Sequence, residues 1–292
     1  MFLAIDIGGT ALKSALFDGE RLVEKRELAS DGSRGTGLLM ENLSRVIEEY
    51  GKVQAIGVDT AGLVDQSQGV IRQAANLAID EPFPLADKIR EKYRVPVVVA
   101  NDVNAAALGE AFYGAARDDR DFICLTYGTG IGGAAVIDKK IYCGHNGMAG
   151  EMGHIIPHPG GRSCPCGISG CYEQYASTTA LVREAKKADP DAVDGRAVFD
   201  IFRRGSGEMK KVIDLWIDEV ILGLVSLVHV FDPSSVVLGG GIMNEDYIIR
   251  RIAESLPGRV IKNYRGVQVK HASLGNSAGV YGMLALLLDY LK

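Results

Sequence analysis

The sequence predicts an α/β fold. Short apolar segments of strand length alternate along the chain with longer segments that repeat apolar residues at helical spacing. The order strand, glycine-rich turn, strand also occurs twice, after residue 7 and after residue 127, which hints at two related halves. The composition, 47% hydrophobic and 24% charged, is typical of a globular protein, and 292 residues allow one large domain or two modest ones.

The first half opens with a buried strand over residues 2–7, which ends at Gly8. A second strand over residues 13–17 follows, so the glycines lie at or near a hairpin turn. The region after it predicts a helix over 36–50, a strand over 53–59 and a loop over 60–65. The alternation continues with a helix over 84–93, a strand over 95–100 and an alanine-rich helix over 104–113.

The second half repeats this order. Residues 122–127 predict a strand, 128–133 a glycine-rich turn and 134–138 the next strand. Further on, residues 209–231 predict a long buried helix that ends at Asp232-Pro233, since proline cannot continue a helix. The remaining elements are a surface connector over 189–195, a strand over 236–238 that runs into three glycines, and helices over 246–256 and 278–291.

Charge and hydropathy exclude several classes of protein. The formal net charge of −5 shows no footprint for nucleic acid. The apolar start, residues 1–5, stops at Asp6 and lacks a basic segment, so we expect no signal peptide. The longest apolar run, 220–231, is too short to span a bilayer. Thiols available for metal, without an export signal, favour the cytoplasm.

Residues 150–173 place His154 and three thiols, Cys164, Cys166 and Cys171, within eighteen residues. One His and three Cys complete a tetrahedral Zn²⁺ shell and leave no position for a catalytic water, so the sequence predicts a structural zinc ion. Glu151 and Glu173 flank the set. A C-x-C pair with Gly167 and Gly170 before the third Cys suits a tight metal-binding turn.

Two other interpretations of these thiols were open. Cys164 and Cys171 could form a disulfide, or all three could be free. The chain has five cysteines, an odd number, so a disulfide framework is not expected. None of the five histidines is followed directly by Glu, so the zinc-protease motif HExxH is absent.

Three glycine-rich turns each close an apolar strand. The first is Asp6-Ile-Gly-Gly-Thr10, the second is residues 128–133 and the third is residues 239–241. Glycines let backbone N–H groups approach phosphate oxygens, and a nearby carboxylate can hold hydrated Mg²⁺. For either of the first two turns alone a plain turn is the better explanation, and for the third a plain turn is adequate, but three together are harder to explain by structure only. The chain lacks a Walker A loop, and a strand rather than a helix follows the first two turns, which argues against a Rossmann fingerprint.

Asn101-Asp102 ends a very apolar strand. An acid at a helix start is often only an N-cap, and position alone favours that interpretation. The functional alternative is a general base that accepts the proton of a substrate hydroxyl during phosphoryl transfer.

These motifs together resemble the ROK family of sugar kinases and sugar-responsive repressors. The resemblance covers essentially the whole chain in order, and its zinc segment is highly specific, whereas its glycine turns are not. It rests on Asp6-Ile-Gly-Gly-Thr10, Asn101-Asp-Val-Asn-Ala105, Gly128-Thr-Gly-Ile-Gly-Gly133, Gly150-Glu-Met-Gly-His154, Cys164-Pro-Cys-Gly-Ile-Ser-Gly-Cys-Tyr-Glu173 and Leu238-Gly-Gly-Gly-Ile242.

The family belongs to the actin/hexokinase/Hsp70-like ATPase superfamily, so the resemblance implies two α/β domains of the ribonuclease H-like type around a central cleft. We expect a first domain over 1–114 completed by 277–292, and a second over 115–276 that carries the zinc motif.

The resemblance also implies roles for individual residues. Asp102 matches the catalytic base. The residues that match the family's ATP and Mg²⁺ contacts are Asp6, Gly8, Gly9, Thr10, Lys13, Gly128, Thr129, Gly130, Gly239, Gly240 and Gly241, with Asp6 near the magnesium ion. The residues that match the family's sugar contacts are Gly62, Asn76, Asn101, Asp102, Glu151, His154 and Glu173. The zinc ligands match His154, Cys164, Cys166 and Cys171, so His154 joins the metal to the sugar.

This chain departs from the family pattern at three places. Ala61-Gly62 stands where the family usually has Pro-Gly. No aromatic residue follows Asn76-Leu77. The acidic residue usual before Ala278-Gly279 is replaced by Ser277. These departures bear on which sugar is bound more than on the chemistry.

The implied function is an ATP-dependent hexose kinase, with O6 of glucose as the expected acceptor. N-acetylmannosamine and β-glucosides are alternative substrates. Two other classes are a sugar-sensing repressor, for which we expect a DNA-binding domain before Asp6, and a silent sugar-binding module, against which Asp102 and the three glycine turns argue. The resemblance further suggests a homodimer, although the helix over 209–231 is at least as compatible with a monomer core.

Overall fold

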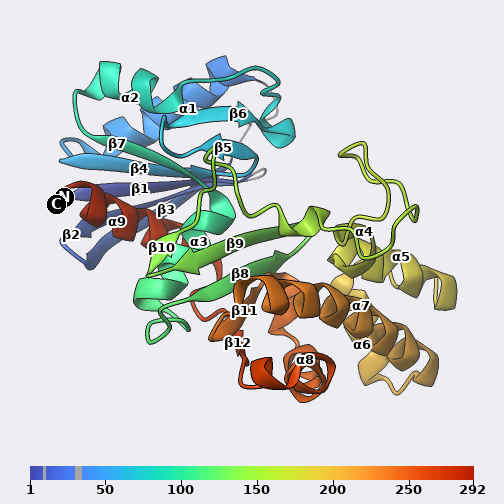
Figure 1. Cartoon of the computed structure of the whole chain (residues 1–292). Helices are drawn as coiled ribbons and strands as arrows, with labels where there is room; N and C mark the ends of the chain where they lie inside the picture. Colours follow the sequence, from blue (N-terminus) through green and yellow to red (C-terminus); the bar gives the residue numbers. More distant parts are fainter. Residues whose placement is uncertain (9–10, 30–34) are drawn as a thin grey trace. The chain divides into compact units, whose positions relative to one another are not determined.

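The computed structural model describes residues 1–8, 11–29 and 35–292. The chain forms two compact units. Unit 1 comprises Met1–Asp118, Lys139–Ala149 and Ser273–Lys292, and unit 2 comprises Asp119–Asp138 and Gly150–Ala272. Each unit contains a mixed sheet with helices (Figure 1). The α/β prediction is therefore confirmed.

The sheet of unit 1 has five strands among the described residues, in the order β3-β2-β1-β4-β7. Strands β1, β4 and β7 run parallel, and β2 and β3 extend the sheet antiparallel on the β1 side. A separate hairpin joins β5 and β6. The bounds are β1 (Phe2–Ile7), β2 (Ala11–Asp18), β3 (Arg21–Ala29), β4 (Ala55–Thr60), β5 (Leu63–Asp65), β6 (Val70–Gln73) and β7 (Val97–Asn101).

Helices cover both faces of this sheet (Figure 1). On one face, α1 (Thr36–Tyr50) and α2 (Leu85–Tyr93) pack on a core that includes Leu3, Ile5 and Ile7 of β1. On the other, α3 (Asp102–Tyr113) and α9 (Ala278–Tyr290) pack on a smaller core that includes Ala4. Because side chains alternate between the faces of a strand, Asp6 shares the face of Ala4.

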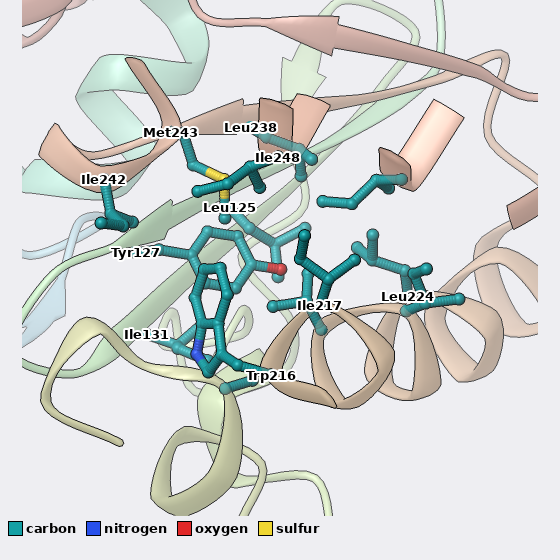
Figure 2. Close-up of a cluster of buried hydrophobic side chains, with 14 of the residues drawn as sticks. Leu125, Tyr127, Ile131, Trp216, Ile217, Leu224, Leu238, Ile242, Met243 and Ile248 are labelled. Atoms are coloured by element: carbon teal, nitrogen blue, oxygen red, sulfur yellow. The ribbon is translucent and has the colours of Figure 1, made fainter. Parts of the chain in front are cut away.

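Unit 2 is built on strands β9, β8, β11 and β12 of the second sheet, whose full order is β10-β9-β8-β11-β12. Helices α5 to α8 supply most of its core, shown in part in Figure 2. The strands of this sheet are β8 (Phe122–Tyr127), β9 (Ile131–Ile137), β11 (Ser235–Gly239), β12 (Gln268–His271) and β10 (Lys140–Ile141), whose residues belong to unit 1. The helices are α4 (Glu173–Ala176), α5 (Thr178–Ala188), α6 (Gly195–Arg203), α7 (Gly207–Phe231) and α8 (Asp246–Arg259).

The predicted elements are present, with shifted ends. Strand β9 begins at Ile131, so the second glycine turn is shorter than predicted, because Gly132 and Gly133 pair in register with β8. Residues 63–65, predicted as loop, form β5. Helix α7 begins at Gly207, two residues before the predicted start, and Ser206 caps it by accepting a hydrogen bond from the Met209 N–H. Among the described residues, none of the helices combines the length and hydropathy needed to cross a bilayer.

Gly223 allows α7 to approach Tyr172 closely, because a Cβ at this position would overlap the tyrosine ring. The ring cannot swing away, since its hydroxyl donates to the Val220 carbonyl oxygen at 2.7 Å. Gly258 in α8 is also helical but has open space around it.

We expect Gly223→Ala to lower the free energy of unfolding by about 1–3 kcal/mol through overpacking, despite alanine's better helix propensity. Gly258→Ala, the matched control, is expected to raise it by about 0.5–1 kcal/mol because only propensity changes there. Urea denaturation of both variants measures the difference. Equal effects at the two positions would contradict the proposed close approach.

Candidate active site

The carboxyl ends of the parallel strands of unit 1 bring acidic residues together. In the β1–β4 register Asp6 lies directly beside Asp59, and β7 ends at Asn101, immediately before Asp102. Such strand ends meet at one edge of a sheet, which is where ligands bind in open α/β sheets. Three carboxyl groups from distant parts of the sequence therefore influence one another.

Asp6 has a cationic neighbour on the adjacent strand. Lys13 is its register partner on β2, and the Lys13 Nζ lies 3.2 Å from an Asp6 carboxylate oxygen. The N–H of Gly8 donates to the Ala11 carbonyl oxygen at 2.9 Å, and a Cβ on Gly8 would lie 2.8 Å from that oxygen. Glycine is thus required at the first turn. The predicted phosphate contacts Gly9 and Thr10 fall outside the described residues.

Asn101, rather than Asp102, is the N-cap of α3. The Asn101 side-chain oxygen accepts from the N–H groups of Val103 at 2.9 Å and Asn104 at 3.1 Å. Asp102 is the first residue of the helix, and its Oδ1 also accepts from the Val103 N–H at 2.9 Å. The cap interpretation of Asp102 is therefore wrong, because the neighbouring amide fills that role.

Burial raises the pKa of the Asp102 carboxyl group above its ordinary range. The bond from the Val103 N–H opposes this rise, and the charge of Asp6 adds to it. A carboxylate with a raised pKa is a stronger base, so Asp102 is suited to accept a proton.

Gly62 and Asn76, two predicted sugar contacts, lie in connected segments of unit 1. The Asn101 side-chain amide donates to the Gly62 carbonyl oxygen at 3.0 Å. Gly62 adopts φ +107, and a Cβ there would overlap the Gln73 carbonyl oxygen. Asn76 lies three residues after Gln73, in the 3₁₀ turn η2 (Ala75–Leu77). The structure thus brings Asn101 beside Gly62, and Gly62 beside the strand that leads to Asn76.

Asp59 is a site residue that the sequence reasoning missed. It is completely buried, and within the described chain neither carboxyl oxygen has a hydrogen-bond partner. Burial raises its pKa well above the usual range, and the charges of Asp6 and Asp102 raise it further. A protonated Asp59 could donate a hydrogen bond to Asp6. The available signal was an acid inside the otherwise apolar strand Ala55–Thr60.

The four predicted zinc ligands of unit 2 converge on one point. Their ligand atoms all lie within 4.8 Å of one another. Cys164 Sγ is 3.8 Å from His154 Nδ1, and the Sγ atoms of Cys166 and Cys171 are 3.5 Å apart. A tetrahedral zinc ion with bonds of about 2.1–2.3 Å holds its ligand atoms about 3.5–3.8 Å apart, so these residues fit zinc.

Two glycines make the turn around this cluster. Gly167 and Gly170 both adopt positive φ, +90 and +91, and the Gly167 N–H donates to the Cys164 carbonyl oxygen at 3.0 Å. A Cβ on Gly170 would overlap the His158 carbonyl oxygen. Gly167 and Gly170 therefore allow the backbone to turn around the sulfur atoms.

The carboxylates that flank the metal cluster contact it. Glu173 Oε1 lies 3.3 Å from Cys164 Sγ, and Glu151 Oε2 lies 3.8 Å from His154 Nε2, the ring nitrogen that faces away from Cys164. Burial raises the pKa of Glu151, while His154 lowers it. The three predicted sugar contacts of unit 2, Glu151, His154 and Glu173, are thus brought together by the cluster.

Unit 2 also contains a pocket of about 790 Å³. Predicted nucleotide contacts Gly128, Thr129 and Gly241 line it, together with apolar Val182 and Ile242. Gly130, Gly239 and Gly240 do not line it. Instead, Gly240 adopts φ +96 at a place where a Cβ would overlap the Tyr127 backbone.

Other lining residues were not predicted, because they come from segments without a motif. These are Tyr127, Thr178, Thr179, Val193, Asp194, Gly195, Arg196, Asn244 and Glu245.

Comparison with known proteins agrees with this architecture. A model of the ROK family matches residues 2–290 of the chain. A glucokinase of Streptomyces coelicolor is 33% identical over 306 residues, a span that covers 96% of this chain and 95% of the relative.

Two solved structures are similar along their whole length. The ROK hexokinase of Thermus thermophilus is 34% identical with a TM-score of 0.88, and the match covers 99% of both chains. A ROK family glucokinase of Streptomyces griseus, solved in complex with glucose and AMPPNP, is 33% identical with a TM-score of 0.84 over 98% of both chains.

The raised pKa of Asp59 predicts a pH-dependent effect on stability. Between its unfolded and folded pKa values the folded chain binds more protons, so Asp59 lowers the free energy of unfolding as pH rises through that window. We expect Asp59→Asn to be more stable than the wild type at pH 8, with a smaller difference at pH 5, as measured by urea denaturation.

Asp65→Asn is the matched control. Burial acts to raise the pKa of Asp65, but the hydrogen bonds from Arg72, Ser67 and Gln68 lower it overall, so this carboxylate contributes stability above its unfolded pKa. Asp65→Asn is therefore expected to have a lower free energy of unfolding than the wild type at neutral pH. A destabilised Asp59→Asn variant at pH 8 would contradict the assignment.

The thiols of the metal cluster predict an order of reactivity. A hydrogen bond from the Ile168 N–H lowers the pKa of the exposed Cys166, whereas burial raises the pKa of Cys164 and Cys171. In metal-depleted protein we expect iodoacetamide to modify Cys166 first, since the thiolate is the reactive form.

Peptide mass spectrometry measures this order, and added zinc should protect all three thiols. Cys143, outside the cluster, is the control, whose modification should not respond to zinc. Earlier modification of Cys164 or Cys171 would refute the expected order.

Proposed function

We propose that this chain, which belongs to the ROK family, is a kinase that transfers the γ-phosphate of ATP to a hexose hydroxyl, with O6 of glucose as the acceptor. The observation that carries the proposal is Asp102, a carboxyl group with a raised pKa at the start of α3, beside Asp6 and freed from the capping role by Asn101.

In the proposed reaction Asp102 accepts the proton of the sugar hydroxyl as that oxygen attacks the γ-phosphorus. A bond forms between the sugar oxygen and phosphorus, and the bond from phosphorus to the β–γ bridging oxygen breaks, which leaves ADP. Phosphoryl transfer depends largely on positioning and electrostatics, so the base contributes through its location and its raised pKa.

Asp6 and Lys13 are the charged residues assigned to the phosphate end of ATP in unit 1. The carboxylate of Asp6 suits hydrated Mg²⁺, which when bound would neutralise charge on the phosphates. Without the ion, the Lys13 ammonium group partly compensates the negative charge of Asp6, since Nζ lies 3.2 Å from an oxygen of its carboxylate.

The pocket of unit 2 is assigned to the adenosine of ATP. Its volume of about 790 Å³ is within the range of small-ligand sites, and apolar side chains line it together with Gly128, Thr129 and Gly241 of the second and third glycine turns. Exposed N–H groups at such turns suit phosphate oxygens.

The His154, Cys164, Cys166 and Cys171 cluster is assigned a structural role. Four protein ligands complete the zinc shell, so the ion would supply folding energy rather than an activated water. Glu151, His154 and Glu173 are assigned to sugar hydroxyls in unit 2, and Gly62, Asn76 and Asn101 in unit 1. His154 would serve both the metal, through Nδ1, and the sugar side, through Nε2.

Glucose is the substrate we favour, because the relatives and the solved structure with a bound sugar named above are glucokinases or a hexokinase. Initial rates with ATP on glucose, mannose, N-acetylglucosamine, N-acetylmannosamine and a β-glucoside test it. We expect the highest kcat/KM on glucose. A higher kcat/KM on N-acetylmannosamine or the β-glucoside would replace the sugar but keep the kinase, whereas no phosphorylation of any sugar would refute the kinase.

Asp102→Asn tests the catalytic base, because the amide keeps the shape and cannot accept the proton. We expect kcat to fall by roughly 10²–10⁴-fold while glucose still binds by calorimetry. The acid limb of kcat/KM should lie above the ordinary aspartate pKa of about 3.9 in the wild type, and should be lost in the variant. Near-wild-type turnover of the variant would refute the mechanism.

A further inference from the structure

The segment Tyr172–Thr179 of unit 2 is hydrogen-bonded to the second glycine turn along much of its length. The hydroxyl groups of Tyr172 and Tyr127 are 2.9 Å apart, and the Thr178 N–H donates to the Gly128 carbonyl oxygen at 3.0 Å. The Thr179 hydroxyl donates to the Thr129 carbonyl oxygen at 2.8 Å, and the Thr178 hydroxyl to the Tyr127 carbonyl oxygen at 3.4 Å. The backbone of the turn is therefore held by residues from another part of the chain.

The same segment begins at the metal cluster. It follows Cys171 directly, and Glu173 at its start lies 3.3 Å from Cys164 Sγ. The other oxygen of Glu173 accepts a hydrogen bond from the Ile131 N–H at 3.4 Å, just beyond the glycine turn. A Cβ on Gly130 would lie 2.6 Å from this carboxylate oxygen, so the turn and Glu173 are in close contact.

The three hydrogen bonds donated by Thr178 and Thr179 orient carbonyl groups at the turn. A peptide plane fixes the direction of the following N–H once its C=O is bonded. Bonds to the carbonyl oxygens of Gly128 and Thr129 therefore determine where the N–H groups of Thr129 and Gly130 point. These N–H groups belong to the turn that the proposed function assigns to the phosphates of ATP.

We infer that Thr178 and Thr179 are positioning residues for the nucleotide, through which occupancy of the metal cluster sets nucleotide affinity as well as sugar affinity. This inference rests on the proposed function. It extends that function because the metal cluster was assigned only to the sugar contacts Glu151, His154 and Glu173.

The chain contains its own reporter for this segment. Trp216 is the single tryptophan of the sequence. It is 3% exposed, and its indole N–H donates to the carbonyl oxygen of Ser177 at 3.0 Å. Figure 2 shows Trp216 and Tyr127 in the same apolar cluster. A displacement of the segment between metal and turn should therefore change the tryptophan emission.

The test compares Thr179→Val with Thr179→Ser by calorimetric titration with AMPPNP and, separately, with glucose. Valine keeps the shape and removes the donor, so AMPPNP affinity should fall roughly three- to tenfold, the effect of one lost hydrogen bond. Serine keeps the hydroxyl and should stay within about twofold of the wild type by the same reasoning. Glucose affinity should remain unchanged in both.

Ser226→Ala is the control, since this hydroxyl is exposed and its hydrogen bond, to the Leu222 carbonyl oxygen, lies within α7. Because Thr179 is exposed, both variants are expected to fold, and tryptophan emission and circular dichroism check this. If Thr179→Val changes the fold, Thr179→Ser is compared with Thr179→Ala instead, because this pair also differs in the hydroxyl group.

A second arm removes the metal from the wild type with a chelator, with metal content measured. Metal removal should shift the Trp216 emission and weaken binding of AMPPNP as well as glucose. Tight AMPPNP binding after metal removal, or wild-type AMPPNP affinity of Thr179→Val, would overturn the inference while leaving the kinase intact. Failure of the metal-loaded wild type to bind AMPPNP at all would instead overturn the proposed function, and the inference with it.

Discussion

The parallel register of β1 and β4 places Asp6 directly beside Asp59, and the rest of the unit 1 site depends on this pairing. Two carboxyl groups so close cannot both ionise in a buried environment without a large cost. The structure divides their roles. Asp6 faces Lys13, whereas burial raises the pKa of Asp59 and favours its protonated form. Burial raises the pKa of Asp102, and the charge of Asp6 raises it further.

Side-chain alternation explains why these acidic residues do not disrupt the larger apolar core of unit 1. Leu3, Ile5 and Ile7 point into the larger apolar cluster beneath α1 and α2, while Asp6 points to the α3 and α9 face. Gly279 near the start of α9 leaves room on that face, since a Cβ there would lie 3.1 Å from the oxygens of Asp59. The acids therefore occupy the end of a layer whose neighbouring residues are small.

In unit 2 the corresponding centre is Cys164. It lies beside His154, Glu173 and Gln174, and its backbone pairs with Ile168 to close the metal-binding turn. A four-ligand metal at this point would restrain the groups assigned to the sugar and, through Tyr172, Thr178 and Thr179, the turn assigned to the nucleotide. A structural ion can thus influence catalysis without contact with the reacting atoms.

Local patterns determined much of this protein from sequence alone. Apolar periodicity located the principal strands and helices, and the spacing of His154, Cys164, Cys166 and Cys171 predicted the cluster, because metal ligands close in sequence need only a short turn to converge. Spacing could not find Asp59, Thr178 or Thr179, nor choose between Asn101 and Asp102 as the helix cap. Their roles arise from strand register and from contacts between residues far apart in the chain. Only the tertiary structure decided them, because burial, which raises the pKa of Asp59 and Asp102, is a property of the packed environment rather than of the residue.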